Sequence, residues 1–273
     1  MYSLGIDVGS SSVKVALLDI ESGKCVCTST NPKSEAPIIA ERKGWAEQDP
    51  DSWWAYLRDG VREMAGAYDL SKVASIGISY QMHGLVALDK AGRPVRNSII
   101  WCDSRAVGIG GEALDGIGYD KCMSHLLNSP GNFTASKLSW VKRNEPETYS
   151  RIDKFMLPGD YIAYLLTGEE TTTATGLSEG ILWDFKDGRR ADFVADWYGI
   201  SRDLFPEVVP AVGVQARTTA RIQEELGIPE GTPVSYRAGD QPNNAFSLNV
   251  LKPGEIAATG GTSGVVYGVT DVP

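Results

Sequence analysis

The chain opens with three short strands separated by tight turns, and this pattern restricts the fold more than any other. Apolar runs cover residues 4–8 and 13–18, and a third strand spans 25–29 after the turn at 21–24. Strands joined this closely pair antiparallel, because a parallel pair needs a crossover of about a dozen residues or more. We therefore expect a sheet that opens with an antiparallel meander. This excludes the βαβ opening of a dinucleotide-binding oxidoreductase, although a glycine follows the first strand.

The first of these turns has the composition of a phosphate-binding turn. Asp7 lies at the end of the first strand, the turn is Gly9, Ser10, Ser11 and Ser12, and Lys14 follows. Turn amides and hydroxyls can bind phosphate oxygens, and a carboxylate beside them can hold Mg²⁺. It is not a Walker A loop, because no Gly-Lys-Ser/Thr opens a helix. The alternative is an ordinary hairpin with an incidental Asp.

A second strand–turn–strand of this kind occurs near the end of the chain. A strand at 255–259 leads into Gly261, Thr262 and Ser263, and another strand follows. One such turn is common hairpin material. Two of them suggest the actin-like, ribonuclease-H-like ATPase fold, an α/β fold with a mixed sheet flanked by helices. In that fold, paired hairpins hold the phosphates of a nucleotide and its metal ion.

Several helices are expected between the two hairpins. Asp49-Pro50 reads as an N-cap with proline at the first helical position, and apolar residues at helical spacing follow it. Residues 135–143 and 160–166 read as further helices. Residues 171–178 are a polar Thr/Gly stretch, which we interpret as a loop or an irregular strand.

Asp240 is the candidate catalytic base. A strand at 233–236 ends just before it, and a helix is expected from about residue 242 to 249. A carboxylate at a helix N-terminus tends to stay ionised because of the helix dipole, as a base must. The alternative is that Asp240 only caps the helix.

Met82-His83 is the candidate sugar-binding turn. His83 is one of two histidines and lies just past an apolar strand at 73–79, before Gly84. An uncharged polyol requires both hydrogen-bond donors and acceptors, which an imidazole can supply. A purely structural histidine is the alternative.

The net charge of −9 argues against nucleic acid or an anionic membrane as the main partner. The longest uncharged run, residues 256–270, is too short and too rich in Gly and Thr to span a bilayer. The first residues lack the basic and apolar segments of a signal peptide. We therefore expect a cytoplasmic protein, and the sequence leaves a homodimer open.

Taken in chain order, these segments resemble the FGGY carbohydrate kinases, and within them the xylulokinases. The resemblance covers essentially the whole chain, and Gln81-Met82-His83-Gly84 matches the xylulokinase form of the sugar-binding turn. The matching segments are residues 7–14, 45–54, 81–84, 101–105, 133–140, 160–168, 239–240 and 261–264.

The resemblance implies an ATP- and Mg²⁺-dependent kinase that phosphorylates a ketopentose, D-xylulose to D-xylulose 5-phosphate. Asp240 would act as general base, and Asp7 would organise the Mg²⁺, directly or through water. The sugar would be bound by Met82, His83, Trp101, Asp103, Asp240 and Gln241. The ATP phosphates would be bound by Gly9, Ser10, Ser11, Ser12, Lys14, Gly261, Thr262 and Ser263.

Two departures from the family pattern leave alternatives open. Gln241 stands where many xylulokinases have Asn, so ribulose, a deoxyketose or a glycerol-like polyol remains an alternative substrate. Family members are also considerably longer than this chain. We expect residues 1–250 to be the N-terminal sugar-binding domain and 251–273 the start of a C-terminal nucleotide-binding domain, so that this N-terminal portion alone has low activity. A non-catalytic actin-like ATPase module is the alternative from another functional class.

Overall fold

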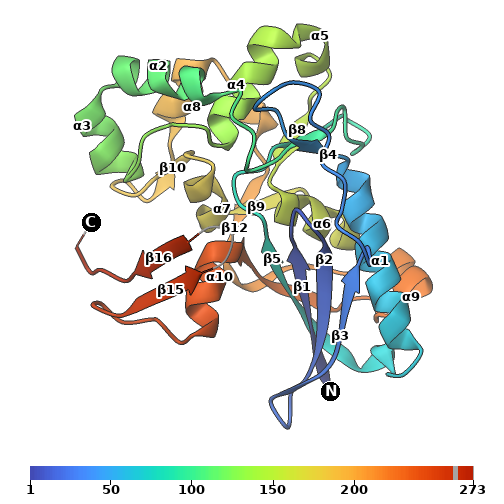
Figure 1. The fold of residues 1–273 in the computed structure, drawn as a ribbon. Helices are drawn as coiled ribbons and strands as arrows, with labels where there is room; N and C mark the ends of the chain where they lie inside the picture. Colours follow the sequence, from blue (N-terminus) through green and yellow to red (C-terminus); the bar gives the residue numbers. More distant parts are fainter. Residues whose placement is uncertain (261–263, 273) are drawn as a thin grey trace.

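The protein is described by a computed structural model that covers residues 1–260 and 264–272, and a six-stranded mixed sheet lies at its centre (Figure 1). The antiparallel meander is confirmed, because β2 pairs antiparallel with β1 on one side and with β3 on the other. β1, β5 and β14 run parallel to one another. Across the sheet the strands are β13 (Val212–Arg217), β14 (Pro233–Gly239), β5 (Val73–Tyr80), β1 (Tyr2–Val8), β2 (Val13–Asp19) and β3 (Lys24–Asn31).

One face of this sheet packs against helices. Side chains alternate along β1, so that Leu4, Ile6 and Val8 are buried on the same face. The covering helices are α1 (Pro50–Ala65), α6 (Pro158–Thr167) and α9 (Ala220–Leu226). α1 begins where the sequence predicts, with the Asp49 side chain accepting a hydrogen bond from the Asp51 amide and proline at the first position.

A second, mainly helical part lies beyond the carboxyl ends of β1 and β5 (Figure 1). It has a hydrophobic core of its own, which includes Leu138, Leu177 and Val194. Its helices are α2 (Val107–Ile117), α3 (Tyr119–Lys121), a π-helical turn (Cys122–Leu126), α4 (Thr134–Asn144), α5 (Pro146–Tyr149), α7 (Ala174–Glu179) and α8 (Asp192–Tyr198).

Short strands and 3-10 turns complete the connections. The short strands are β4 (Glu47–Gln48), β6 (Val86–Leu88), β7 (Ser98–Ile99), β8 (Lys154–Met156), β9 (Thr171–Thr173), β10 (Trp183–Asp184), β11 (Arg189–Arg190) and β12 (Glu207–Val209), and the 3-10 turns are Leu70–Lys72 and Arg202–Leu204.

The predicted loop or irregular strand at 171–178 is wrong for its second half, because α7 occupies that half. β9 supplies a Thr-rich strand, and the Thr173 hydroxyl then accepts a hydrogen bond from the Gly176 amide at the N-terminus of α7. Leu177 is buried in the helical core. A hydroxyl cap and one buried leucine are enough to form a short helix where helix propensity is poor.

The chain ends in the hairpin of β15 (Ile256–Gly260) and β16 (Gly264–Gly268), beside α10 (Asp240–Ser247). The predicted turn residues Gly261, Thr262 and Ser263 lie outside the described residues. Among the helices of residues 1–260 and 264–272, none has the length and apolar character needed to cross a membrane.

Candidate active site

Three turns meet at one edge of the sheet because three parallel strands end in register. Val8 at the end of β1 is paired with Tyr80 at the end of β5, and Tyr80 is paired with Gly239 at the end of β14. The chain therefore leaves the sheet at neighbouring points to form the Gly9–Ser12 turn, the Gln81–His83 turn and the start of α10. This register brings together segments that lie far apart in the sequence.

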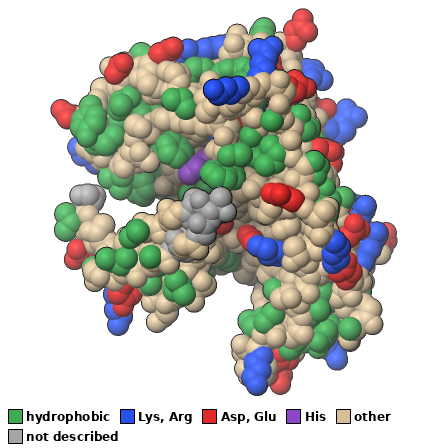
Figure 2. Space-filling view, in the orientation of Figure 1, with side chains coloured by type: hydrophobic (Ala, Val, Ile, Leu, Met, Phe, Trp, Pro, Cys, Tyr) green, Lys and Arg blue, Asp and Glu red, His purple; other side chains and the backbone are tan. Residues whose placement is uncertain are grey.

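These turns border a cavity of about 540 Å³. A separate hollow, between the helical part and the hairpin β15–β16, is visible in Figure 2. Of the predicted residues, those lining the cavity are Asp7, Gly9, Ser10, Ser11, Lys14, Met82, His83, Trp101, Asp240 and Gln241. Ser12 and Asp103 do not line it. Gln81, which belongs to the matched sugar-binding turn, also lines the cavity, and the sequence interpretation missed Ser79, Asn244 and Val265, which line it too.

Asp7 and Lys14 face each other across the first hairpin. They are register partners on β1 and β2, and Lys14 Nζ lies 3.6 Å from Asp7 Oδ2. Their side chains are 37% and 59% exposed, so this ion pair contributes little to stability. Both groups are accordingly accessible to a ligand in the cavity.

The serine turn after β1 is held from outside. The Gln48 side-chain amide donates to the Ser10 carbonyl at 2.6 Å, and the Gly9 amide donates to the Ser12 carbonyl at 3.0 Å. Trp101 Nε1 lies 3.3 Å from Ser10 Oγ, which links this turn to the segment after β7. The main-chain shape of the turn is thus set without using the Ser11 hydroxyl, which lies at the exposed edge of the cavity.

Asp240 is the first residue of α10, and Gly239 is the N-cap with no side-chain cap hydrogen bond. Asp240 therefore occupies the first helical position and not the N-cap, and its carboxyl accepts hydrogen bonds from main-chain amides at the start of the helix. The expectation that the helix terminus keeps this group easily ionised is corrected by its surroundings. Burial and, next, the charge of Asp7 raise the pKa of Asp240, and hydrogen bonds from nearby main-chain amides only partly oppose them. A raised carboxyl pKa lies closer to the pH at which a general base works best.

Gly239 allows the candidate sugar-binding turn at Gln81–His83, called the sugar turn below, and the start of α10 to approach closely. A Cβ at Gly239 would lie 2.4 Å from Met82 Cγ and 3.4 Å from Glu179 Oε1. Any larger residue would therefore displace Met82 or the start of α10. The glycine of the Gly-Asp pair is explained by this contact.

His83 adopts the left-handed region, with φ of 63°, which is uncommon for a residue with a side chain. Its Nδ1 lies 2.9 Å from the Glu179 carbonyl oxygen, and a carbonyl only accepts. Nδ1 therefore carries a proton. Burial lowers the pKa of His83 to about 4, so the neutral ring has Nε2 as an acceptor at neutral pH.

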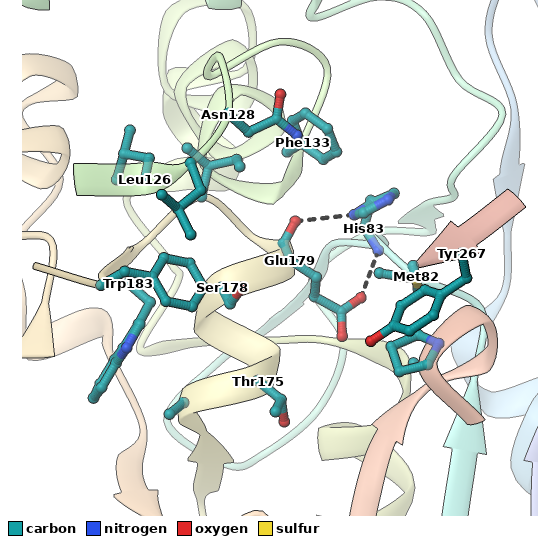
Figure 3. Close-up of a pocket in the computed structure, with 16 residues that line it drawn as sticks. Met82, His83, Leu126, Asn128, Phe133, Thr175, Ser178, Glu179, Trp183 and Tyr267 are labelled. Carbon is teal, nitrogen blue, oxygen red and sulfur yellow. Dashed lines mark hydrogen bonds between the residues drawn. The ribbon is translucent and has the colours of Figure 1, made fainter. Parts of the chain in front are cut away.

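Glu179 is the main functional candidate that the sequence interpretation missed. Figure 3 shows it on α7, directed toward Met82 and His83. Tyr80 Oη lies 2.6 Å from its Oε1, and the His83 amide donates to its Oε2 at 3.0 Å. Burial raises the pKa of Glu179 to about 8, although the hydrogen bonds from Tyr80 and His83 act in the opposite direction. The only signal in the sequence is an acidic residue directly after the polar Thr/Gly stretch of residues 171–178, for which we expect a loop or an irregular strand.

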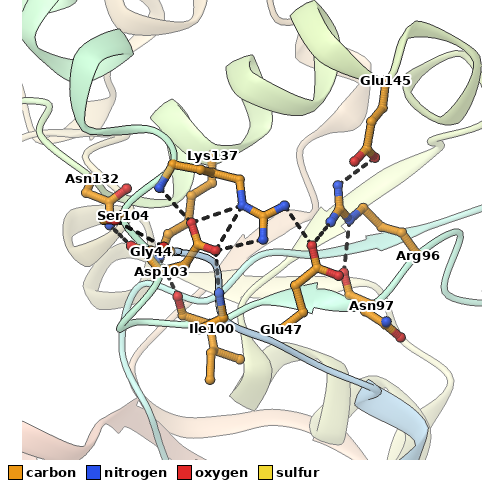
Figure 4. Close-up of polar contacts among 12 residues, drawn as sticks. Gly44, Glu47, Arg96, Asn97, Ile100, Asp103, Ser104, Asn132, Lys137 and Glu145 are labelled. Atoms are coloured by element: carbon orange, nitrogen blue, oxygen red, sulfur yellow. Dashed lines mark hydrogen bonds and ion pairs between the residues drawn. The ribbon is translucent and has the colours of Figure 1, made fainter. Parts of the chain in front are cut away.

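Asp103 points into a buried polar network (Figure 4). Its carboxylate accepts from the Ala46 amide at 2.7 Å and from Arg105 Nη2 at 2.7 Å. Arg105 in turn contacts Glu47 at 2.6 Å and lies over the Trp45 ring, 3.8 Å from its centroid. This network fixes the segment that carries Trp101. The carboxylate of Asp103 is already engaged by the Ala46 amide and Arg105, so it is not directed into the cavity where it was expected to bind the sugar.

A second cavity, of about 460 Å³, lies on the other side of the sugar turn and shares Met82 and His83 with the first (Figure 3). Its walls are largely apolar, and they include Phe133 and Trp183. The Phe133 ring packs edge-on against the His83 ring with centroids 4.5 Å apart. The imidazole thus forms a partition between the two cavities.

Comparison of the sequence with protein families gives one clear match. The N-terminal domain of the FGGY family of carbohydrate kinases matches residues 2–247. The xylulose kinase of Escherichia coli (strain K12) is 30% identical over 272 residues, which covers 99% of this chain and 54% of the relative. That of Klebsiella pneumoniae is 32% identical over 275 residues, covering 99% and 55%. The chain thus spans about half the length of the curated relatives it matches.

Solved structures of sugar kinases have the same fold as this chain. A xyloylose kinase from Brucella ovis superposes with a TM-score of 0.90 at 30% identity, covering 97% of this chain and 54% of that chain. The ligand-bound xylulose kinase from Lactobacillus acidophilus gives 0.88 at 26%, covering 97% and 53%. A Plasmodium falciparum glycerol kinase gives 0.87 at 20%, over 97% and 53%, a likeness of fold alone. The predicted actin-like ATPase fold is confirmed.

Proposed function

The chain belongs to the FGGY family of carbohydrate kinases, and we propose that it supplies the sugar site and part of the phosphate site of an ATP-dependent sugar kinase. One observation carries the proposal. A single cavity is lined by a carboxylate with a raised pKa, by the Met82-His83 turn, and by the serine turn after β1. These are the groups needed to accept a proton, bind a polyol and bind a phosphate.

In this proposal Asp240 removes the proton from the sugar hydroxyl as that oxygen attacks the γ-phosphate of ATP. His83 Nε2 accepts a hydrogen bond from another hydroxyl, and Gln241 and Trp101 supply donors at the cavity wall. Ser10, Ser11 and Lys14 bind the transferred phosphate. Positioning of this kind accounts for much of the rate enhancement in phosphoryl transfer.

The donor set of the cavity fits a magnesium ion. Asp7 and Asp240 line the same cavity, and the charge of Asp7 raises the pKa of Asp240. Carboxylate, hydroxyl and water oxygens are the ligands that Mg²⁺ prefers, so Asp7 would hold it directly or through water. When bound, the ion neutralises charge on the ATP phosphates.

We propose D-xylulose as the sugar and D-xylulose 5-phosphate as the product. The relatives named xylulose kinase, which are 30–32% identical, support this choice. Gln241 is the feature that favours testing ribulose, a deoxyketose and glycerol beside it. We also propose that the sugar-binding domain comprises residues 1–250 and that a nucleotide-binding domain begins at residue 251.

The central test is Asp240→Asn. We expect turnover to fall by about 10²–10⁴-fold, because the amide cannot accept the proton, while D-xylulose still binds. Turnover is followed as ADP release, with this chain continued by the second half of a relative, and binding is followed by calorimetry with this chain. Asp115→Asn, an exposed carboxyl on α2, is the matched control. Loss of binding with turnover retained would overturn the role of Asp240.

The substrate is tested separately, with a panel of D-xylulose, D-ribulose, a deoxyketose and glycerol titrated into the wild-type chain. We expect D-xylulose to bind most tightly. If another of these compounds binds more tightly, the sugar is reassigned while the kinase assignment stands. If none binds, the sugar site itself is wrong.

A further inference from the structure

Glu179 contacts the sugar turn in two ways at once. Its side chain accepts the His83 main-chain N–H at 3.0 Å, and its main-chain carbonyl accepts the ring N–H of His83 at 2.9 Å. Its other carboxyl oxygen lies 2.6 Å from the hydroxyl of Tyr80, at the end of β5. One residue of α7 therefore holds both the backbone and the ring of His83 (Figure 3).

The remaining main-chain group of His83 is held from the opposite side. Lys137 Nζ donates to the His83 carbonyl at 2.9 Å and to the Ile100 carbonyl at 3.0 Å. The main-chain N–H, the carbonyl and Nδ1 of His83 are thus all engaged. Among the polar groups of His83, Nε2 alone has no hydrogen-bond partner within residues 1–260 and 264–272. His83 lines the cavity that Asp240 also lines.

We propose that Glu179 is a positioning residue for sugar recognition, which holds His83 in its left-handed conformation and in the Nδ1–H form so that Nε2 meets the sugar only as an acceptor. The proposal rests on the sugar-kinase function proposed above and extends it to a residue outside the matching segments. Glu179 does not transfer a proton in the reaction. It acts on the sugar through His83.

The chemistry of this arrangement selects for a hydroxyl. An Nε2 acceptor forms a hydrogen bond with an O–H donor at the matching position and gains nothing from a carbonyl or ether oxygen there. The left-handed backbone is costly for a residue with a side chain, so it persists where surrounding contacts hold it. The Glu179 carboxyl and the Lys137 ammonium supply those contacts on either side of the residue.

The burial of the carboxyl agrees with this role. Glu179 is 7% exposed, and its pKa of about 8 keeps much of it neutral at neutral pH. A neutral carboxyl offers one acceptor oxygen for the His83 N–H and one hydroxyl for Tyr80, whose own hydroxyl can either donate or accept. Glutamine offers the same pair of groups with the same reach, whereas alanine offers neither.

The test is calorimetric titration of D-xylulose into the full 273-residue chain and its variants. We expect Glu179→Ala to weaken binding by about tenfold or more, and Glu179→Gln to stay within about threefold of wild type. Ser178→Ala, a neighbour on α7 that also lines the second cavity, is the control and should bind as wild type. If Glu179→Ala fails to fold, Glu179→Asp replaces it, because the shorter side chain cannot reach the His83 amide.

A second readout does not depend on the sugar. The ¹⁵N chemical shifts of the His83 ring should show the neutral Nδ1–H form in the wild type and in Glu179→Gln. We expect a mixture of tautomers in Glu179→Ala and Glu179→Asp, because losing the side-chain contact to the His83 main-chain N–H lets the ring move away from the carbonyl of residue 179, which these variants keep. If the tautomer and sugar affinity of these variants match the wild type, Glu179 does not position His83. If no variant binds sugar but the ring shifts change as expected, the positioning holds and the proposed substrate is wrong.

Discussion

At the scale of single residues, the site is defined by ionisable groups whose burial opposes their charge. Glu179 and His83 are in direct contact, and burial moves both toward their neutral forms: the pKa of Glu179 is raised to about 8, and that of His83 is lowered to about 4. The charges of Asp160 and Asp240 also raise the pKa of Glu179, whereas the hydrogen bond from Tyr80 lowers it. At neutral pH, hydrogen bonds between largely neutral groups therefore link Glu179 to the sugar turn.

The pKa of Glu179 predicts a pH-dependent loss of stability. Between its ordinary pKa of 4.5 and about 8, the folded state keeps a proton that the unfolded state has lost. The free energy of unfolding should therefore fall as pH rises through this window, by at most about 1.4 kcal/mol per pH unit from this group. Glu179→Gln should remove that contribution. In urea unfolding, the free energy of unfolding of this variant should therefore rise relative to that of the wild type from pH 5 to pH 8.

Two further measurements give this prediction its control. Glu224→Gln, at an exposed position on α9, should leave the pH profile of the wild type unchanged. His83 contributes with the opposite sign, because stability from its neutral ring is lost as pH falls from 6.5 toward about 4. A Glu179→Gln profile parallel to the wild type above pH 5 would contradict the assigned pKa.

At the scale of elements, the helical part is docked through close backbone contacts. A Cβ on Gly110 of α2 would lie 1.8 Å from the Gly131 carbonyl oxygen, which belongs to the loop that leads to Phe133. Phe133 packs against the His83 ring. The packing of α2 is thus linked to the sugar turn through one short loop.

This contact predicts opposite effects for two adjacent glycines. Gly110→Ala should lower the free energy of unfolding by about 1–3 kcal/mol, because main-chain atoms of the loop cannot move aside cheaply. Gly111→Ala, whose Cβ would meet nothing within 4 Å, should raise it by about 0.5–1 kcal/mol through helix propensity. Urea unfolding of both variants measures this. Equal effects from the two substitutions would show that the loop yields.

At the scale of the whole molecule, two hydrophobic cores account for the packing of the described chain. The core under the sheet includes Leu4 and Val234, and the helical core includes Leu138 and Val194. The terminal hairpin belongs to neither, and Ile256 and Val266 on it are 67% and 76% exposed. The hairpin is therefore an appendage to the packed body in this structure.

This division predicts where the chain can be shortened. A chain that ends at residue 250 should keep its free energy of unfolding within about 1 kcal/mol, because the hairpin removes little apolar surface from water. A chain that ends at residue 232 should not fold, because it loses β14 and the buried Val234. Thermal and urea unfolding compare the three lengths. A large loss at 250 would contradict the proposed boundary.

The sequence by itself determined the features that depend on local pattern. The meander follows from apolar runs and short turns, and the start of α1 follows from Asp49-Pro50. The order of motifs led to the family and hence to Asp7, Met82, His83 and Asp240. Each of these needs only neighbouring residues or a recognisable motif.

Only the tertiary structure decided which side chains share the site. Glu179 lies 96 residues from His83 in the chain, and no local pattern links the two. Asp103 lies in a motif that predicts a place in the sugar pocket, yet its carboxylate accepts hydrogen bonds from Arg105 and the Ala46 amide. The parallel register of β1, β5 and β14 brings these segments together, and burial then sets the pKa of Asp240, His83 and Glu179. Residues that are distant in sequence determine both the position of these side chains and their pKa values. The sequence therefore predicted the turns of the site but not the residues that hold them.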